Sequence, residues 1–134
     1  MISELRKSAG RMNTAVRTWA AGIDFSTVYL STVTISELSQ WVALTQRRDP
    51  AQGETLNAWL RDSVLRWYDG RILPVDTEVA LLAGRLHVPN PGDYRDAFVA
   101  ATAVHHGLTV ATRNVRDFSP MRVPLVNPFD VPTS

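Results

Sequence analysis

Hydrophobic and polar positions follow two periods along this chain, one typical of buried strands and one typical of helices. Short apolar or β-branched runs bounded by turn residues predict strands at 27–31, 71–75, 108–112 and 124–126. Apolar residues repeated every three or four positions predict helices at 1–9, 13–21, 34–46, 54–68, 78–86 and 96–106. Because helical segments separate the strands, this order predicts an α/β fold whose parallel sheet is covered by helices on both faces.

The central helices carry clear apolar stripes. The helix at 34–46 is expected to bury Leu38, Trp41, Val42 and Leu44. The helix at 54–68 is expected to bury Leu56, Trp59, Leu60, Val64 and Trp67. Between the two, the segment 47–50 contains Pro50 and predicts a break. Further along the chain, Gly107 predicts the C-terminal cap of the helix at 96–106.

Three acidic residues occupy positions that a parallel sheet brings to one edge. Asp96 starts a helix and shares a face with the small, core-facing residues Ala100 and Ala103. Glu37 follows the strand at 27–31, and Asp117 follows the strand at 108–112. Reactive groups of open α/β sheets collect beyond the carboxyl ends of the strands, so we expect these three carboxylates to meet there.

Converging carboxylates repel one another unless a cation lies between them. Mg²⁺ and Mn²⁺ prefer oxygen ligands, and the chemistry that they support best is hydrolysis of phosphodiesters by an activated water. The trio therefore predicts a metal-dependent phosphodiesterase. The competing interpretation of each acid is a helix cap or a solvated surface residue. Arg113 and Arg116 flank the predicted site and suit phosphate binding, with ordinary solvated residues as the alternative.

Composition narrows the class of protein further. A chain of 134 residues suits one domain, and its net charge of +1 provides no bulk attraction for nucleic acid. Thirteen of the 14 basic residues are nonetheless Arg, the side chain suited to forked phosphate contacts. The absence of Cys excludes disulfides and thiolate metal sites. With no apolar run long enough for a membrane span and no secretory signal, a cytoplasmic protein is expected.

Several segments, found in the right order, together resemble one family. They are ISELRK at 2–7, TISEL at 34–38, RILPVD at 71–76, DAFVAATAVHHGLTVATRNVRDF at 96–118 and LVNPF at 125–129. This pattern is similar to that of the PIN-domain ribonucleases of VapC type, the toxins of bacterial toxin–antitoxin pairs. The long segment from Asp96 to Phe118 is the specific part of the match, and the resemblance covers almost the entire chain.

The resemblance implies a three-layer α/β/α sandwich with a central parallel sheet and an endoribonuclease that depends on Mg²⁺ or Mn²⁺. It implies transfer or ribosomal RNA as the substrate class, a cognate VapB-type antitoxin and a homodimer. The acids of the family carry over to Glu37, Asp96 and Asp117, with Thr112 and Asn114 as supporting polar groups.

One part of the family pattern is missing from the 134 residues. The family begins with a central strand that ends in D-T-N-V and contributes its first acid, whereas Met1 stands here where that Val would be. We therefore expect a single PIN-like domain over residues 1–134 that is truncated at its N-terminus relative to the family. A misassigned GTG start codon would explain the difference, and sequencing the native N-terminus tests it. The alternatives are a catalytically inactive module that binds antitoxin or RNA without cleaving, and a gene remnant that does not fold.

Overall fold

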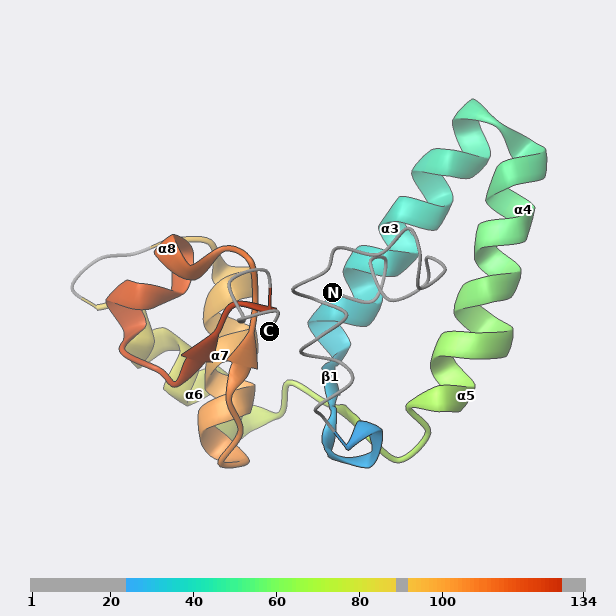
Figure 1. Ribbon diagram of the computed structural model, residues 1–134. Helices are drawn as coiled ribbons and strands as arrows, with labels where there is room; N and C mark the ends of the chain where they lie inside the picture. Colours follow the sequence, from blue (N-terminus) through green and yellow to red (C-terminus); the bar gives the residue numbers. More distant parts are fainter. Residues whose placement is uncertain (1–23, 89–91, 129–134) are drawn as a thin grey trace, which may run out of the picture. The chain divides into compact units, whose positions relative to one another are not determined.

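The computed structural model describes residues 24–88 and 92–128 (Figure 1). The chain divides into two compact units: residues 29–77 form one, and the described parts of the other are 24–28, 78–88 and 92–128. The helices predicted at 1–9 and 13–21 lie outside the described residues.

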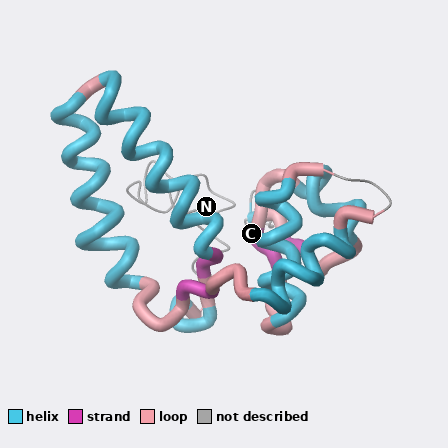
Figure 2. Tube along the Cα trace, turned by 180° about the vertical axis from the view of Figure 1, so that it is seen from behind, coloured by secondary structure: helices cyan, strands magenta, loops and turns pink. Residues whose placement is uncertain are grey.

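The unit of residues 29–77 is built around a helical hairpin. Its elements are β1 (Leu30–Ser31), α3 (Thr32–Arg48), α4 (Pro50–Trp59), a π-helical segment (Leu60–Val64), α5 (Leu65–Trp67) and β2 (Ile72–Leu73). Helices α3 and α4 lie side by side (Figures 1 and 2). Strands β1 and β2 pair in parallel, with Leu30 opposite Ile72 and Ser31 opposite Leu73. The hairpin is therefore the crossover that parallel pairing requires.

The chain reverses between α3 and α4 at a single residue, Asp49. Its backbone N–H donates to the carbonyl oxygen of Thr45 at 2.7 Å and ends α3. Its side chain accepts a hydrogen bond from the backbone N–H of Gln52 at 3.2 Å and caps α4. The predicted break at 47–50 is confirmed, but the next helix begins at Pro50 and not at 54. Proline lacks only an N–H that the first turn of a helix does not use, and Asp49 is a favoured cap.

Two residues of the predicted stripes are in fact exposed. Leu44 is 58% exposed, whereas the next residue, Thr45, is 3% exposed. Trp67 is 50% exposed, whereas Tyr68 is 1% exposed. The π-helical segment explains the second error. Its wider turns take up more residues than α-helical turns, so beyond the segment Tyr68, and not Trp67, returns to the face that holds Leu56 and Leu60.

The first predicted strand, 27–31, is shorter than expected. Residues Phe25–Thr27 form a 3₁₀ turn, and only Leu30–Ser31 belong to β1. The Asp24 carboxylate accepts hydrogen bonds from the backbone N–H and the hydroxyl of Ser26, at 3.0 and 2.7 Å. The hydroxyl of Thr27 donates to the carbonyl oxygen of Asp24 at 2.7 Å. These local hydrogen bonds stabilise a turn in place of extended backbone. Apolar periodicity alone does not reveal them.

The second unit contains the other pair of strands. Its elements are α6 (Thr77–Leu86), α7 (Tyr94–His105), β3 (Val110–Ala111), α8 (Val115–Phe118), a 3₁₀ turn (Ser119–Met121) and β4 (Leu125–Val126). Strands β3 and β4 pair in parallel, with Val110 opposite Leu125 and Ala111 opposite Val126. Both pairings confirm the predicted parallel direction. The ladder continues one residue past β3, because the N–H of Thr112 donates to the carbonyl oxygen of Val126 at 3.0 Å.

A small apolar cluster holds this second unit together. Its buried members come from α7, β3, α8 and the segment before β4, and they are Ala100, Ala103, Val110, Phe118 and Val123. Alanines on α7 allow the helix to lie close to the strands, and α7 contacts both β3 and α8. The single aromatic ring of the cluster therefore comes from α8, the element that also carries Asp117.

The predicted cap at Gly107 is confirmed. This glycine has a φ of 67°, in the left-handed region that favours residues without a side chain. The N–H of Leu108 donates to the carbonyl oxygen of Ala103 at 2.8 Å, which closes the end of α7 as in a Schellman motif. The chain then passes directly into β3, so the cap fixes where the strand begins.

Candidate active site

Asp96 lies in the first turn of α7, one residue before the most tightly packed part of the helix. Its side chain is half-buried, and Ala97, Ala100 and Ala101 behind it are fully buried. The sequence therefore correctly predicted that this carboxylate lies against the core side of the helix. The positive end of the helix dipole stabilises a carboxylate at this position.

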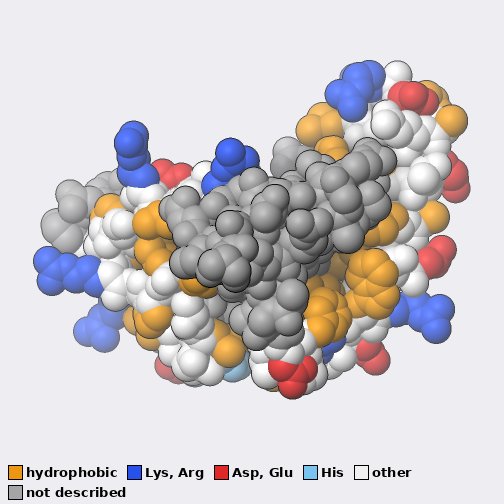
Figure 3. All heavy atoms as spheres, in the orientation of Figure 1, with side chains coloured by type: hydrophobic (Ala, Val, Ile, Leu, Met, Phe, Trp, Pro, Cys, Tyr) orange, Lys and Arg blue, Asp and Glu red, His pale blue; other side chains and the backbone are white. Residues whose placement is uncertain are grey.

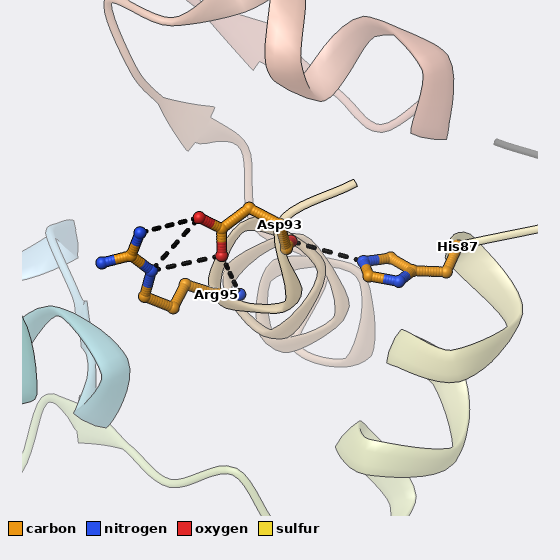
Figure 4. A network of polar contacts seen from close by, with 3 residues as sticks. All are labelled: His87, Asp93 and Arg95. Atoms are coloured by element: carbon orange, nitrogen blue, oxygen red, sulfur yellow. Dashed lines mark hydrogen bonds and ion pairs between the residues drawn. The ribbon is translucent and has the colours of Figure 1, made fainter. Parts of the chain in front are cut away.

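The helix begins two residues earlier than predicted, because Asp93 is its cap. The Asp93 carboxylate accepts a hydrogen bond from the backbone N–H of Arg95 at 2.8 Å. The Arg95 guanidinium also binds this carboxylate, with Nη2 2.7 Å from Oδ2 and Nε 3.2 Å from Oδ1 (Figure 4). These side-chain and backbone hydrogen bonds from Arg95 lower the pKa of Asp93 to about 2. Asp93 therefore carries a negative charge one turn before Asp96.

His87 completes this group of residues from the end of α6. The imidazole is 8% exposed, with its Nε2 3.3 Å from the carbonyl oxygen of Asp93 (Figure 4). Its ring lies 4.4 Å from the ring of Tyr94, centre to centre. The sequence analysis assigned no role to His87 and did not predict these contacts. A signal was available in Asp93, an Asp directly before a helix and three residues before Asp96.

The polar turn after β3 contains the second candidate acid. The backbone N–H of Asn114 donates to the hydroxyl oxygen of Thr112 at 3.0 Å, and the N–H of Asp117 donates to the carbonyl oxygen of Asn114 at 3.1 Å. These bonds tie the turn to the end of β3 and start α8. Asp117 itself is exposed, and its neighbour Phe118 is 4% exposed. The hydrogen bond between Thr112 and Asn114 thus holds the backbone segment that positions Asp117.

Arginine side chains surround this part of the molecule. Arg113 and Arg116 are both exposed, on either side of Asn114. Basic side chains, all of them arginines in the part of the chain that the structure describes, project from the surface of the unit that contains α6, α7 and α8, at the left of Figure 3. The predicted phosphate-binding residues are thus exposed to solvent beside the turn that carries Asp117.

Glu37 belongs to the other unit. It lies on α3, which begins directly after β1 because the Ser31 hydroxyl accepts a hydrogen bond from the backbone N–H of Val33 at 3.0 Å. Glu37 is exposed beside the buried residue Leu38, which is 9% exposed. Within residues 24–88 and 92–128, no three His, Asp or Glu side chains form a group able to hold a metal ion. Convergence of Glu37 with Asp96 and Asp117 therefore stays a prediction.

Comparison with known proteins shows which family has this arrangement. The family model described as "PIN domain" matches residues 5–122. The chain is a PIN-domain protein. The toxin FitB of Neisseria gonorrhoeae is 34% identical over 122 residues, which cover 87% of this chain and 86% of FitB. The VapC ribonuclease Y4jK of Sinorhizobium fredii is 32% identical over 138 residues, covering 97% of this chain and 94% of Y4jK.

Solved structures agree with this assignment. The crystal structure of FitAcB from Neisseria gonorrhoeae matches 97% of this PIN-domain chain and 94% of its own chain, with a TM-score of 0.86 and 32% identity. The structure of FitAB bound to an IR36 DNA fragment matches 98% and 92%, with a TM-score of 0.85 and 30% identity. These matches confirm the predicted α/β/α fold class. The names of the relatives confirm a PIN-domain toxin of VapC type, from a family that includes ribonucleases.

None of the helices in residues 24–88 and 92–128 combines the length and the apolar character that crossing a membrane requires.

Proposed function

We propose that this PIN-domain protein is a metal-dependent endoribonuclease, the toxin of a type II toxin–antitoxin module, which hydrolyses RNA phosphodiesters. The observation that carries the proposal is the placement of Asp96. It is a half-buried carboxylate on the alanine-rich face of α7, in the same compact unit as Asp117. Removing a carboxylate from water costs free energy unless a positive charge or hydrogen bonds compensate for it. Relatives of this chain are named ribonucleases.

The chemistry of the donor atoms fits Mg²⁺ or Mn²⁺. Glu37, Asp96 and Asp117 offer only carboxylate oxygens, and the chain has no Cys to favour a softer metal. We propose that these three residues hold the ion, directly or through water. A bound ion of this kind would polarise a phosphate oxygen and favour ionisation of the attacking water.

The residues of the chain supply the remaining functions. A carboxylate oxygen of the trio accepts the proton of the attacking water. Arg113 and Arg116, exposed beside the acidic turn, bind phosphate oxygens of the RNA backbone. Thr112 and Asn114 hold the turn through their hydrogen bond and so fix the position of Asp117. Such positioning matters because in-line attack tolerates little displacement of the reacting groups.

The proposal extends to partners. Relatives are solved as FitAcB and as FitAB, and we propose a VapB-type antitoxin as the cognate partner here. Transfer or ribosomal RNA is the proposed substrate class, and the cytoplasm, where these RNAs occur, is the proposed compartment. The toxin itself is proposed to be a homodimer.

Cleavage of RNA by the purified protein tests the proposal. With total transfer RNA as the probe and Mg²⁺ present, the wild-type chain should cut, and excess EDTA should abolish cutting. Asp96→Asn should lower the rate at least about 100-fold, because it removes a charged ligand without changing the shape of the side chain. Asp93→Asn is the matched control: asparagine still caps α7, so cleavage should stay within about threefold of wild type.

Two results would contradict the proposal. Cleavage that persists both in EDTA and in the Asp96→Asn protein would show that another activity cuts the RNA. Binding of RNA or antitoxin without cleavage would favour the inactive binding module.

A further inference from the structure

His87 is a buried polar side chain that the proposed mechanism does not use. It directly follows α6, and its imidazole is 8% exposed. The Nε2 atom lies 3.3 Å from the carbonyl oxygen of Asp93, the residue that caps α7 (Figure 4). A carbonyl oxygen only accepts hydrogen bonds, so Nε2 carries a proton and donates it. The imidazole therefore connects the end of one helix to the beginning of the next.

The carbonyl oxygen of Asp93 has a second partner. It accepts a hydrogen bond from the backbone N–H of Ala97 at 3.3 Å, the first bond within α7. A carbonyl oxygen has two lone pairs, so both bonds form at once. Asp96 lies inside the turn that the bond from Ala97 closes. The group that His87 holds is thus part of the turn that carries the Asp96 carboxylate.

Ring contacts support this hydrogen bond. Tyr94 is the first residue of α7, and the centre of its ring lies 4.4 Å from that of His87, with the two planes 43° apart. On the same helix, the ring of Phe98 lies 5.9 Å from the ring of Tyr94. The hydrogen bond at one edge of the imidazole and the ring contact together restrict its rotation about the side-chain bonds.

Other interactions of this turn shape it but do not place it against α6. Asp93 and Arg95 both belong to the turn itself, and their side chains are 42% and 57% exposed, so water screens the ion pair. The buried side of the helix is lined by Ala97, Ala100 and Ala101, whose methyl groups make dispersion contacts without a preferred direction. A hydrogen bond from outside the helix is directional and therefore fixes where the turn lies.

We propose that His87 is a positioning residue for Asp96: its imidazole holds the first turn of α7, and with it the Asp96 carboxylate, in place from the end of α6. The inference rests on the proposed function, because it takes Asp96 as a metal ligand. Loss of a residue that orients a metal ligand typically lowers metal affinity about 10- to 100-fold. His87 acts through the backbone of the turn, so we expect the lower end of this range.

Two substitutions separate the hydrogen bond from the rest of the side chain. Glutamine and methionine are both unbranched and of similar length, and both remove the ring that contacts Tyr94. The glutamine amide can donate to the carbonyl oxygen of Asp93, whereas the methionine thioether cannot. His87→Gln should keep the Mn²⁺ affinity of the purified chain within about threefold of wild type, and His87→Met should lower it at least about tenfold. Electron paramagnetic resonance of free Mn²⁺ measures this affinity.

Amide hydrogen exchange tests the positioning without metal or RNA. The N–H of Ala97 is bonded to the carbonyl oxygen of Asp93, so its exchange rate reports on the first turn of α7. In the metal-free protein, followed by NMR, Ala97 should exchange at least about fivefold faster in His87→Met than in His87→Gln. Amides in the second half of α7 should exchange equally in both variants.

Val79→Ala is the control for a general loss of stability. Val79 is fully buried on α6, about two helical turns before His87. Its truncation leaves a cavity, so the melting temperature should fall. The Mn²⁺ affinity should nevertheless stay within about threefold of wild type, because the hydrogen bond to Asp93 is intact. Circular dichroism establishes that all variants are folded.

The outcomes separate this inference from the nuclease proposal. The inference is overturned if Ala97 exchanges at the same rate in His87→Gln and His87→Met, or if these two variants bind Mn²⁺ with equal affinity. It is also overturned if Val79→Ala weakens Mn²⁺ binding as much as His87→Met does. A wild type that binds no Mn²⁺ contradicts the nuclease proposal, and the exchange of Ala97 then decides by itself whether His87 holds the turn.

Discussion

Replacing Phe118 with alanine should both destabilise the protein and displace Asp117. The Phe118 ring is 4% exposed and is the largest member of the cluster formed with Ala100, Ala103, Val110 and Val123. The other buried members of the cluster are alanines and valines, which are too small to fill the space that the ring leaves. Phe→Ala changes in protein cores cost about 3–5 kcal/mol. We expect about 3–4 kcal/mol here, because the cluster is small and lies near the surface of its unit.

That loss is large in relation to the whole molecule. Domains of this size are stable by about 5–15 kcal/mol, so the variant should remain folded at low temperature while its urea midpoint falls clearly. Helix α8 has four residues, and the side chain of Asn114 makes no capping bond to it. Phe118 is therefore the main anchor of the helix that carries Asp117. We expect RNA cleavage to fall at least about tenfold under conditions where the variant is fully folded.

Two measurements check this prediction. Urea unfolding followed by circular dichroism measures the loss of stability, and the transfer RNA assay at 10 °C measures the loss of cleavage. Leu44→Ala is the control, since that side chain is 58% exposed and its removal should change stability by less than about 0.5 kcal/mol. A loss below about 1 kcal/mol for Phe118→Ala would refute the packing argument. Undiminished cleavage by a destabilised protein would refute the anchoring argument.

Two further predictions concern a close helix contact and a titrating cap. Gly53→Ala should lower the melting temperature, because its Cβ would lie 2.5 Å from Cα and 2.7 Å from N of Gln46, on backbone that cannot easily move. Gly84→Ala should raise the melting temperature, because a Cβ there meets nothing within 4 Å and alanine favours the helix more than glycine does. Equal shifts of the melting temperature for the two variants, measured by calorimetry, would contradict the close contact between Gly53 and Gln46. The pKa of Asp93 is lowered from 3.8 to about 2, so its contribution to stability is present above pH 4 and is lost between pH 4 and 2. Asp93→Asn should flatten the pH dependence of the urea midpoint in that window, and an unchanged slope would show that the ion pair with Arg95 does not persist in solution.

The sequence predicted those features that depend on residues close together in the chain. The cap at Gly107 follows from one glycine after an apolar helix, and the break before Pro50 follows from one proline. The core-side position of Asp96 follows from the helical spacing of Ala100 and Ala103. Each of these depends on local geometry, which periodicity and residue type express directly.

Features that depend on distant contacts were not predictable in this way. Strands predicted with five residues pair over only two, because the length of a ladder is set by the partner strand. The exposure of Trp67 depends on a π-helical segment that has no composition of its own. The tilted rings of His87, which follows α6, and Tyr94, which begins α7, lie in contact, and no periodicity relates these two residues.

The candidate site divides along the same line. The positions of Asp96 and Asp117 at the two ends of the α7–β3–α8 segment were readable, because that segment is continuous in sequence. Glu37, in contrast, is far from these two acids in sequence and belongs to the other unit. The meeting of Glu37 with Asp96 and Asp117 therefore stays a prediction. The Asp96→Asn and EDTA experiments test the site as a whole and do not test the role of Glu37 by itself.

The reversal at Asp49 leaves the α3–α4 hairpin without a loop. One residue ends the first helix through its N–H and begins the second through its side chain, and the carbonyl oxygen of Asp49 accepts from the N–H of Gly53 at 2.9 Å. The number of residues between Gln46 and Gly53 therefore determines which residues of the two helices face each other. An inserted or deleted residue at this tip would shift one helix along the other and move Gly53 away from Gln46. Among relatives, length variation should consequently fall elsewhere, and this tip is a poor place to attach a tag or a second domain.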